Sequence, residues 1–303
     1  MIVWERLRVF AAVAEHGSIS GAAAALHITG SAVTQHVRKL EREVRCPLVE
    51  PDGRGIRLTT AGRVLADTAL HVAGTIAEAE RDLANLHGQI VGPLRIGAIA
   101  TALRAHIPQV LHTLTARHPR LTPTLRDGEV VDMIPALRSR HLDAVVTESW
   151  STRPSRYPPG IHLTELIRED VHLAVPDGHP LASRSAPIPL ADLGDLAWVS
   201  CPPGTDPHEA LVHTLRGHNV DADVRYCVTD YTTHLLLVAA GLAVALVPRM
   251  ARHPQPDGVR FLRTASSITR TIGVATVEGV HTPAVDAFVA VLRDQVAAWS
   301  PEL

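Results

Sequence analysis

The sequence contains few cysteines, almost no lysine and no long apolar run, and these shortages exclude several classes of protein. The three cysteines are scattered and odd in number, which excludes a secreted disulfide framework. The longest apolar run, residues 235–247, is too short to span a bilayer and predicts a buried helix, turn and strand. Glu5 and Arg6 stand where a signal peptide would be apolar. We therefore expect a cytoplasmic protein without a membrane partner.

Signatures of enzymes and metal sites are also missing from the sequence. It contains no P-loop, no GxGxxG or GxSxG motif and no paired-carboxylate pattern, so we expect no enzymatic activity. The 18 histidines are dispersed, and His208 and His213 lack the paired cysteines of a zinc site. We expect neither a metal nor another cofactor.

Charge is unevenly distributed along the chain, although the formal net charge is only −2. Lys39 is the only lysine, so arginine supplies nearly all of the positive charge. Residues 1–62 carry eight basic and six acidic side chains, whereas the remainder carries 21 basic and 25 acidic ones. A locally basic head on a mildly acidic body is compatible with DNA binding but is weak evidence by itself.

The first 44 residues predict three short amphipathic helices. Apolar side chains recur at helical spacing in each segment: Leu7, Phe10, Ala11 and Ala14; then Ile19, Ala22, Ala23 and Leu26; then Val33, Val37, Leu40 and Val44. Gly17 can end the first helix, and Ser18 and Thr29 can cap the next two. This arrangement is typical of a helix-turn-helix core, with the motif itself at about residues 19–38.

The third helix has a polar outer face that could enter a DNA groove, and it is followed by a predicted hairpin. That face comprises Ser31, Thr34, Gln35 and Arg38. Turn dipeptides at residues 52–55 separate two short β-prone segments, so residues 47–62 predict a wing that carries Arg54 and Arg57. From periodicity alone, a solvated helix surface is the more usual interpretation of such a face.

The same segment resembles the DNA-binding domain of LysR-type transcriptional regulators. The resemblance rests on LRVFAAVAEHGSISGAAAALHITGSAVTQHVRKLE, then PL, Arg54 and LTTAG, over about sixty residues. It implies a winged helix-turn-helix domain over residues 1–62 that binds double-stranded promoter DNA. The implied groove contacts are Ser31, Thr34, Gln35 and Arg38, and Arg54 is the implied wing contact. Gly30 and Pro51 depart from the family pattern, which commonly has glutamine and arginine there, so we expect an altered sequence preference.

Residues 60–88 predict a long helix with a heptad seam. The seam consists of Leu65, Ala69, Val72, Ile76, Ala79, Leu83 and Leu86. It could pack on its own domain, or it could pair with a second copy of the chain. The resemblance implies the second alternative, with dimerisation through Leu65, Ala69, Val72, Ile76, Leu83 and Leu86 and further pairing into a tetramer.

Strand-like and helix-like segments alternate from residue 93 onward, which predicts an α/β architecture with parallel sheets. The segments LRIG, LDAVV and VAAGLAVALVP resemble the effector-binding domain of the same family. That resemblance implies a fold similar to periplasmic solute-binding proteins over residues 93–303. Subdomain I would comprise about 93–166 and 268–303, subdomain II about 167–267, and two crossover strands would join them.

Ligands of open α/β sheets bind beside the carboxyl ends of strands, so the residues that follow the strands are the candidate effector contacts. They are Ala100, Thr101, Gly128, Glu129, Thr147, Glu148, Ser200, Cys201 and Asp230. Three of these residues are acidic, which favours an effector that is cationic or rich in hydrogen-bond donors. Alternatively, the acids cap helices or face solvent, and Asp230 could be an N-cap.

The sequence therefore predicts an effector-responsive transcriptional regulator rather than an enzyme. RNA polymerase is a possible further partner. The alternatives are an effector-independent DNA-binding protein and, less favoured, a redox sensor that uses Cys201 and Cys227. A pure solute-binding protein is disfavoured because ligand binding does not require residues 17–62.

Overall fold

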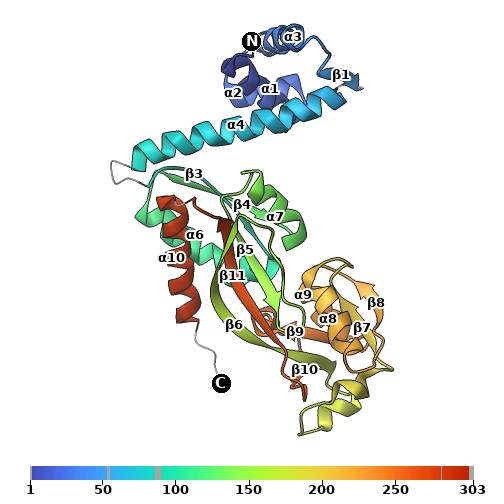
Figure 1. Ribbon diagram of the computed structural model, residues 1–303. Coiled ribbons are helices and arrows are strands. Elements are labelled where there is room, and N and C mark those ends of the chain that lie inside the picture. Colours follow the sequence, from blue (N-terminus) through green and yellow to red (C-terminus); the bar gives the residue numbers. More distant parts are fainter. Residues whose placement is uncertain (1, 53–54, 86–89, 281, 300–303) are drawn as a thin grey trace. The chain divides into compact units, whose positions relative to one another are not determined.

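The computed structural model describes residues 2–52, 55–85, 90–280 and 282–299. The chain divides into two compact units, Met1–Gly88 and Gln89–Leu303, and each is treated separately below (Figure 1). Within the described residues, no helix combines the length and apolar character needed to cross a membrane.

The first unit begins with three helices, α1 (Trp4–His16), α2 (Ile19–Leu26) and α3 (Gly30–Val44). The predicted caps are confirmed: Gly17 ends α1 in the left-handed conformation, and the side chains of Ser18 and Thr29 accept hydrogen bonds from Gly21 N and Ala32 N. Apolar residues of all three helices, among them Phe10, form one buried core. Strands β1 (Val49–Asp52) and β2 (Gly55–Leu58) pair antiparallel and form the wing.

Helix α4 (Thr60–Asn85) packs along α1 within the same unit. Its first turn lies so close to the segment before the wing that a Cβ at Gly62 would fall 2.0 Å from Leu48 O. Ala69 is fully buried, and Leu65 and Val72 pack in the same cluster as α1 residues.

The predicted dimer seam is therefore wrong for Ala69, because α1 already covers it. Leu65 and Val72 also have partners inside their own unit. Ile76 is half-buried and Leu83 is exposed, so the distal half of the seam stays a prediction, and Leu86 lies outside the described residues.

The second unit is built on a seven-stranded sheet in the order β10-β6-β11-β5-β3-β4, with β9 also paired to β6. The strands are β3 (Gly92–Ala98), β4 (Leu121–Asp127), β5 (Ala144–Trp150), β6 (Ile161–Pro176), β9 (Ala245–Pro248), β10 (Val259–Leu262) and β11 (Thr269–Val277). Strand β3 is parallel to β4 and β5, whereas β11 is antiparallel to β5 and β6. The expected parallel pairing is present among β3, β4 and β5, but the sheet is mixed because β11 runs antiparallel to its neighbours.

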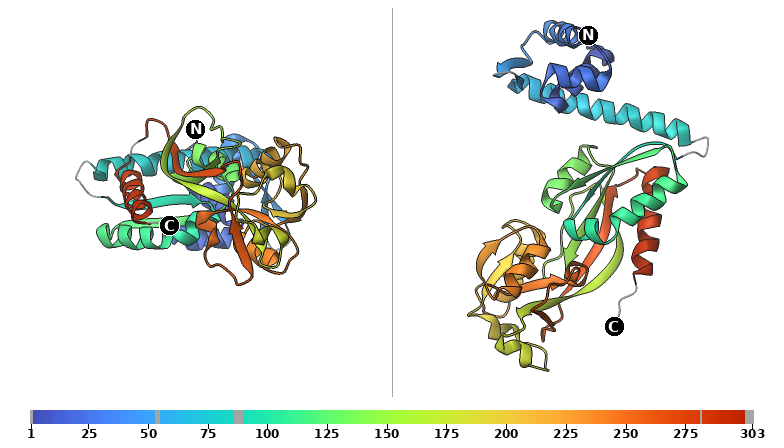
Figure 2. Two further views of the ribbon diagram at one scale, coloured as in Figure 1. Left: turned by 90° about the horizontal axis from the view of Figure 1, so that it is seen from below. Right: turned by 180° about the vertical axis from the view of Figure 1, so that it is seen from behind.

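Helices cover both halves of this unit. In the first half they are α5 (Ala100–Ala105), α6 (Ile107–Arg117), α7 (Val130–Arg138) and α10 (Pro283–Ala298). The views in Figures 1 and 2 show α6 and α10 side by side against the sheet. The second half adds a parallel pair, β7 (Ala197–Ser200) and β8 (Asp223–Cys227), with α8 (Asp206–Arg216) and α9 (Tyr231–Ala239). Short 3-10 turns at Pro180–Ser183, Leu190–Leu193 and Arg249–Arg252 complete the unit.

The two halves are joined through β6. Residues 161–170 of this strand pair with β11, and residues 171–176 pair with β9 and β10. The subdomain boundary expected near residue 167 thus falls inside one continuous strand.

Candidate DNA-binding helix and effector cleft

The outer face of α3 presents three exposed polar side chains at helical spacing. Ser31, Gln35 and Arg38 are exposed at positions i, i+4 and i+7, while Val33 and Val37 on the opposite face are buried. This segregation of polar and apolar residues orients the polar face of α3 toward solvent.

Local hydrogen bonds hold the beginning of this helix. Thr34 is half-buried, and its hydroxyl donates to Gly30 O at 2.9 Å, so it is less available to DNA than its three neighbours. The hydroxyls of Thr29 and Ser31 lie 2.9 Å apart. A Cβ at Gly30 would meet only Ile19 Cγ2, at 3.6 Å, so packing does not require glycine at this departure from the family pattern.

The wing is tied to α3 by a carboxylate. Glu41 Oε1 accepts hydrogen bonds from Leu48 N at 2.9 Å and Val49 N at 3.4 Å. On the hairpin, Arg57 forms an ion pair with Glu50 at 2.9 Å, and Pro51 is exposed. The predicted wing contact, Arg54, lies outside the described residues.

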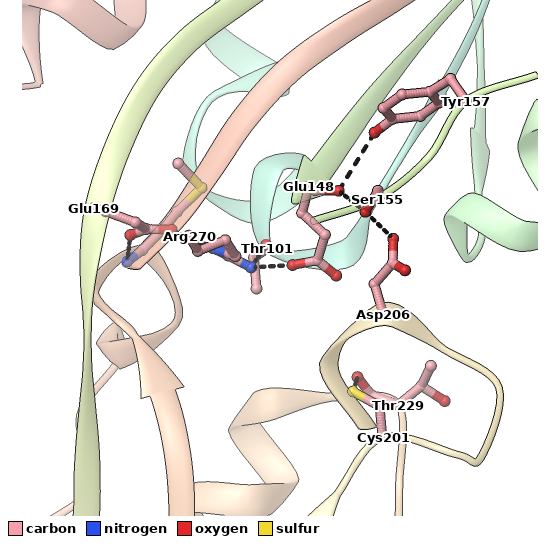
Figure 3. A network of polar contacts seen from close by, with 10 residues as sticks. Thr101, Glu148, Ser155, Tyr157, Glu169, Cys201, Asp206, Thr229 and Arg270 are labelled. Carbon is pink, nitrogen blue, oxygen red and sulfur yellow. Dashed lines mark hydrogen bonds and ion pairs between the residues drawn. The ribbon is translucent and has the colours of Figure 1, made fainter. Parts of the chain in front are cut away.

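In the second unit, a buried arginine occupies the place where the two halves join. Arg270 on β11 lies directly opposite Glu169 on β6, and its Nε donates to Glu169 Oε1 at 2.7 Å. Its Nη1 donates to Glu148 Oε2 at 2.8 Å and to Thr101 Oγ1 at 3.2 Å. Met250 N donates to the second oxygen of Glu169 at 2.6 Å. Figure 3 shows the guanidinium between the two carboxylates.

This cluster places one cation between two carboxylates, and all three side chains are at most 4% exposed. Burial raises the pKa of Glu148, and Arg270 only partly offsets that rise. Burial alone would lower the pKa of Arg270, but Glu169 and Glu148 raise it above its usual value. Arg270 therefore stays charged and neutralises part of an acidic centre.

The predicted effector residues fall into two groups. Ala100, Gly128, Glu129 and Asp230 line one cavity of about 640 Å³ between the two halves. The other predicted residues are buried below the surface of the cleft and do not line that cavity: Thr101, Thr147, Glu148, Ser200 and Cys201.

Asp230 has structural partners that account for its position. Its Oδ2 caps α9 by accepting from Thr233 N at 3.1 Å. Its Oδ1 forms an ion pair with Arg104 of α5 at 2.6 Å, and Arg104 also donates to Thr232 Oγ1 at 2.5 Å. Arg104 thus links the two halves at this cavity, and the N-cap interpretation of Asp230 is supported.

A second cavity, of about 840 Å³, is lined by α7, residues 152–158 and the start of α8. The sequence did not predict this cavity, because its polar residues do not directly follow a strand. Residues 152–158 come after the end of β5, and Asp206 begins α8. Ser155 Oγ donates to Asp206 Oδ2 at 2.9 Å, and Tyr157 OH donates to Thr147 Oγ1 at 3.0 Å. The only sequence signal was the proline-rich stretch 154–159.

Glu129 has an unusual electrostatic environment. Burial, followed by the charges of Glu148, Asp127, Asp206 and Asp132, raises its pKa to about 7. The structure shows no ion pair to Glu129 among the described residues. Burial also raises the pKa of Asp206, which the Ser155 hydrogen bond and Arg153 partly offset.

Burial makes Cys201 poorly suited to a redox role. Cys201 is 2% exposed, and its Sγ donates to Thr229 O at 3.7 Å. Burial, reinforced by Glu148 and Glu129, raises the pKa of the thiol. Because the thiolate is the reactive form, Cys201 is a poor nucleophile in this environment. Cys227 is exposed and, like Cys201, is a free thiol.

Comparison with family models identifies both units. Residues 4–63 match the model of the bacterial regulatory helix-turn-helix protein, lysR family, and residues 87–297 match the LysR substrate-binding domain. The chain belongs to the LysR family. It is therefore a DNA-binding transcriptional regulator with a C-terminal substrate-binding domain, and the predicted family and fold class are confirmed.

Individual LysR relatives cover nearly the whole chain. The regulator TfdS of Cupriavidus pinatubonensis is 29% identical over 96% of this chain and 97% of its own length. OxyR of Escherichia coli K12 is 28% identical over 88% and 87%. Among solved structures, full-length OxyR of Pseudomonas aeruginosa is 20% identical with a TM-score of 0.73, covering 97% of this chain and 98% of that one. CbnR complexed with its target DNA is 22% identical with a TM-score of 0.68, covering 97% and 100%. The last two similarities establish the fold.

Proposed function

We propose that this LysR-family regulator reads promoter DNA through α3 and that a small molecule in the cleft of the second unit modulates this binding. The observation that carries the DNA assignment is the exposed row Ser31, Gln35 and Arg38, which lies on α3 within the family-matched unit. Arginine and glutamine side chains can form paired hydrogen bonds with base edges in the major groove.

Recognition of a dyad-symmetric promoter site would require at least two copies of α3, one from each chain of a dimer. A dimer spaces two recognition helices to match a dyad-symmetric site, which multiplies affinity without new base contacts. The distal half of α4, which carries Ile76 and the exposed Leu83, is the segment we assign to self-association, and further pairing would give a tetramer. RNA polymerase would be the downstream partner, and no catalytic step is assigned to the chain.

Effector control is supported by the position of the cleft above the junction of the two halves. A ligand that contacts Glu129 would act on a carboxyl group coupled to Glu148, which is a partner of Arg270. Arg270 in turn joins β5, β6 and β11. Such a ligand shifts the equilibrium only if it binds one arrangement of the halves better than the other. The redox alternative is disfavoured because the Cys201 thiol is buried and protonated.

The decisive experiment is a footprint on the DNA that flanks the protein's own gene, with the full chain and its variants. We expect one bounded, dyad-symmetric protected site, and Arg38→Ala should weaken binding there by about 1–3 kcal/mol if it contacts a base. The matched control is Arg216→Ala, which removes the same charge from a 71% exposed side chain in the second unit.

Uniform coating of the DNA would support the architectural alternative. Equal weakening by both variants would contradict the assignment of α3 as the reading element.

A further inference from the structure

A small cavity lies in the interior of the second unit. It is lined by residues of β5, β7, α8, α9 and β9, and every one of these residues is buried. Trp150, at the end of β5, lies opposite Arg270 in the ladder with β11. The cavity therefore adjoins the place where the two halves of the unit join.

Two polar side chains that line this cavity carry a nitrogen without a hydrogen-bond partner among the residues that the structure describes. The nitrogens are Nε1 of Trp150 and Nδ1 of His234, and these side chains are 2% and 1% exposed. A buried polar group without a partner loses the hydrogen bonds that water would provide, so native proteins rarely leave one unpaired. The two nitrogens are therefore an indication of a bound molecule between them.

The hydrogen bond on the other side of the imidazole ring determines what each nitrogen can do. Nε2 of His234 lies 2.5 Å from Val228 O, and because a carbonyl oxygen only accepts, Nε2 carries the proton. Burial lowers the pKa of His234, and the bond to Val228 and the charge of Asp230 offset this only in part, so the ring is neutral. Nδ1 is then an acceptor, whereas the indole Nε1 of Trp150 can only donate.

This pairing of a donor with an acceptor restricts the chemistry of the bound molecule. A metal or ammonium ion cannot accept a hydrogen bond from Trp150, and an anion without a proton cannot donate one to His234. The cavity leaves about 10 Å³ open to the centre of a water-sized sphere, which is roughly the room that a single water molecule needs. Val199, Pro207 and Leu211 supply much of the remaining wall and are apolar.

We propose that one water molecule is bound inside this cavity, where it accepts a hydrogen bond from Trp150 Nε1 and donates one to His234 Nδ1. It thereby links the end of β5 to α9. This water site goes beyond the proposed function and is independent of it, because it belongs to the folded unit whether or not an effector binds.

The water also has a consequence for the larger structure around α9. By donating to Nδ1, it stabilises the tautomer of His234 in which Nε2 donates to Val228 O. Val228 lines the cavity of about 640 Å³, together with Thr229 and Asp230. His234 is therefore a positioning residue for this part of the cavity wall.

The first test is a crystal structure of the full chain at a resolution that shows ordered water. We expect one peak of density at about 2.7–3.2 Å from both Trp150 Nε1 and His234 Nδ1. The proposal is overturned if that peak is missing, if it contacts only one of the two nitrogens, or if either nitrogen bonds directly to the protein. This test needs no variant, so it does not depend on whether a substituted chain folds.

The second test asks in solution whether the two side chains share a partner. Trp150→Phe, His234→Gln and the double variant are unfolded in urea and followed by circular dichroism. Each single change removes one partner of the water, so the second change should cost less once the first has been made. The loss of unfolding midpoint in the double variant should be smaller than the sum of the single losses by roughly 0.2–1 M.

The matched control uses Trp198→Phe. Trp198 is also fully buried and also has an indole nitrogen without a partner among the described residues, but it does not line this cavity. Its loss should add to that of His234→Gln. Additive losses in both pairs, or the same coupling in both, would contradict a water shared by Trp150 and His234.

The positioning role of His234 is tested by two amide substitutions. The amide nitrogen of Gln can reach the place of Nε2, whereas the shorter Asn reaches only the place of Nδ1 and cannot bond to Val228 O. Hydrogen exchange in the full chain, measured by mass spectrometry on a peptide that contains residues 228–230, should be several-fold faster in His234→Asn than in His234→Gln. Equal exchange in the two variants would overturn this role.

Discussion

Replacement of Arg270 by methionine should destabilise the second unit strongly. The side chain is fully buried and is bound by Glu148 and Glu169, which are themselves 3% and 4% exposed. Methionine retains much of the volume but removes the charge and the hydrogen bonds. The two carboxylates then remain buried without a cation, and Thr101 loses a hydrogen-bond donor.

The magnitude follows from the cost of leaving a buried charge uncompensated. Breaking a buried ion pair by removing one partner costs about 3–5 kcal/mol. With a urea m-value of about 3 kcal/mol per molar, appropriate to a unit of this size, the unfolding midpoint should fall by roughly 1–1.7 M. Trp150 and Trp198 are buried in this unit and report its unfolding by fluorescence.

The loss should depend on pH in a defined direction. Without Arg270, nothing offsets the burial that raises the pKa of Glu148, so this carboxyl group binds a proton more tightly in the folded state than in the unfolded state. Stability then falls as pH rises through the unfolded pKa, about 4.3, toward the higher folded value. The deficit relative to the unsubstituted protein should be small at pH 5 and complete at pH 8.

A triple variant, Arg270→Met with Glu148→Gln and Glu169→Gln, provides the control. It removes both stranded charges and should recover at least half of the lost stability at pH 8. A loss below about 1 kcal/mol, or a deficit that is the same at pH 5 and pH 8, would refute the claim that Arg270 neutralises this centre.

Two further predictions concern close packing and thiol chemistry. Gly62→Ala places a Cβ 2.0 Å from Leu48 O and should cost about 1–3 kcal/mol of stability, measured by thermal unfolding of the first unit. The control, Gly30→Ala, places a Cβ 3.6 Å from its nearest neighbour and should not destabilise this unit. Equal melting temperatures of the two variants would argue against the close approach at Gly62. In native protein at pH 7.5, iodoacetamide should label exposed Cys227 at least tenfold faster than buried Cys201, and rapid labelling of Cys201 in Cys227→Ser would restore the redox alternative.

The DNA-binding unit was largely predictable because local sequence determines it. Helical spacing identified the buried face of α3, and Ser18 and Thr29 cap as expected. The seam of α4 was less predictable, because an apolar stripe does not specify its partner. The tight approach of the Gly62 turn to Leu48 helps to position α4 beside α1, which buries Ala69.

Residues of the cleft were predictable from the sequence only where they directly follow the carboxyl end of a strand. Ala100 and Glu129, which line the cavity, could be placed there from the alternation of strands and helices. Arg270 could not, because its register opposite Glu169 joins residues 101 positions apart and is set by strand pairing. Asp206, which lines the larger cavity, was missed for a similar reason, since only the tertiary structure brings α8 against β5.

The continuity of β6 limits how the second unit can move. One stretch of this strand belongs to the ladder with β11 and the next to the ladder with β9 and β10, so no loose joint lies between them at this point. Wide opening would have to break ladder hydrogen bonds near residues 169–171. The two halves share β6 as a common strand. A ligand would therefore change their relation by a small twist of the sheet rather than by a wide hinge motion.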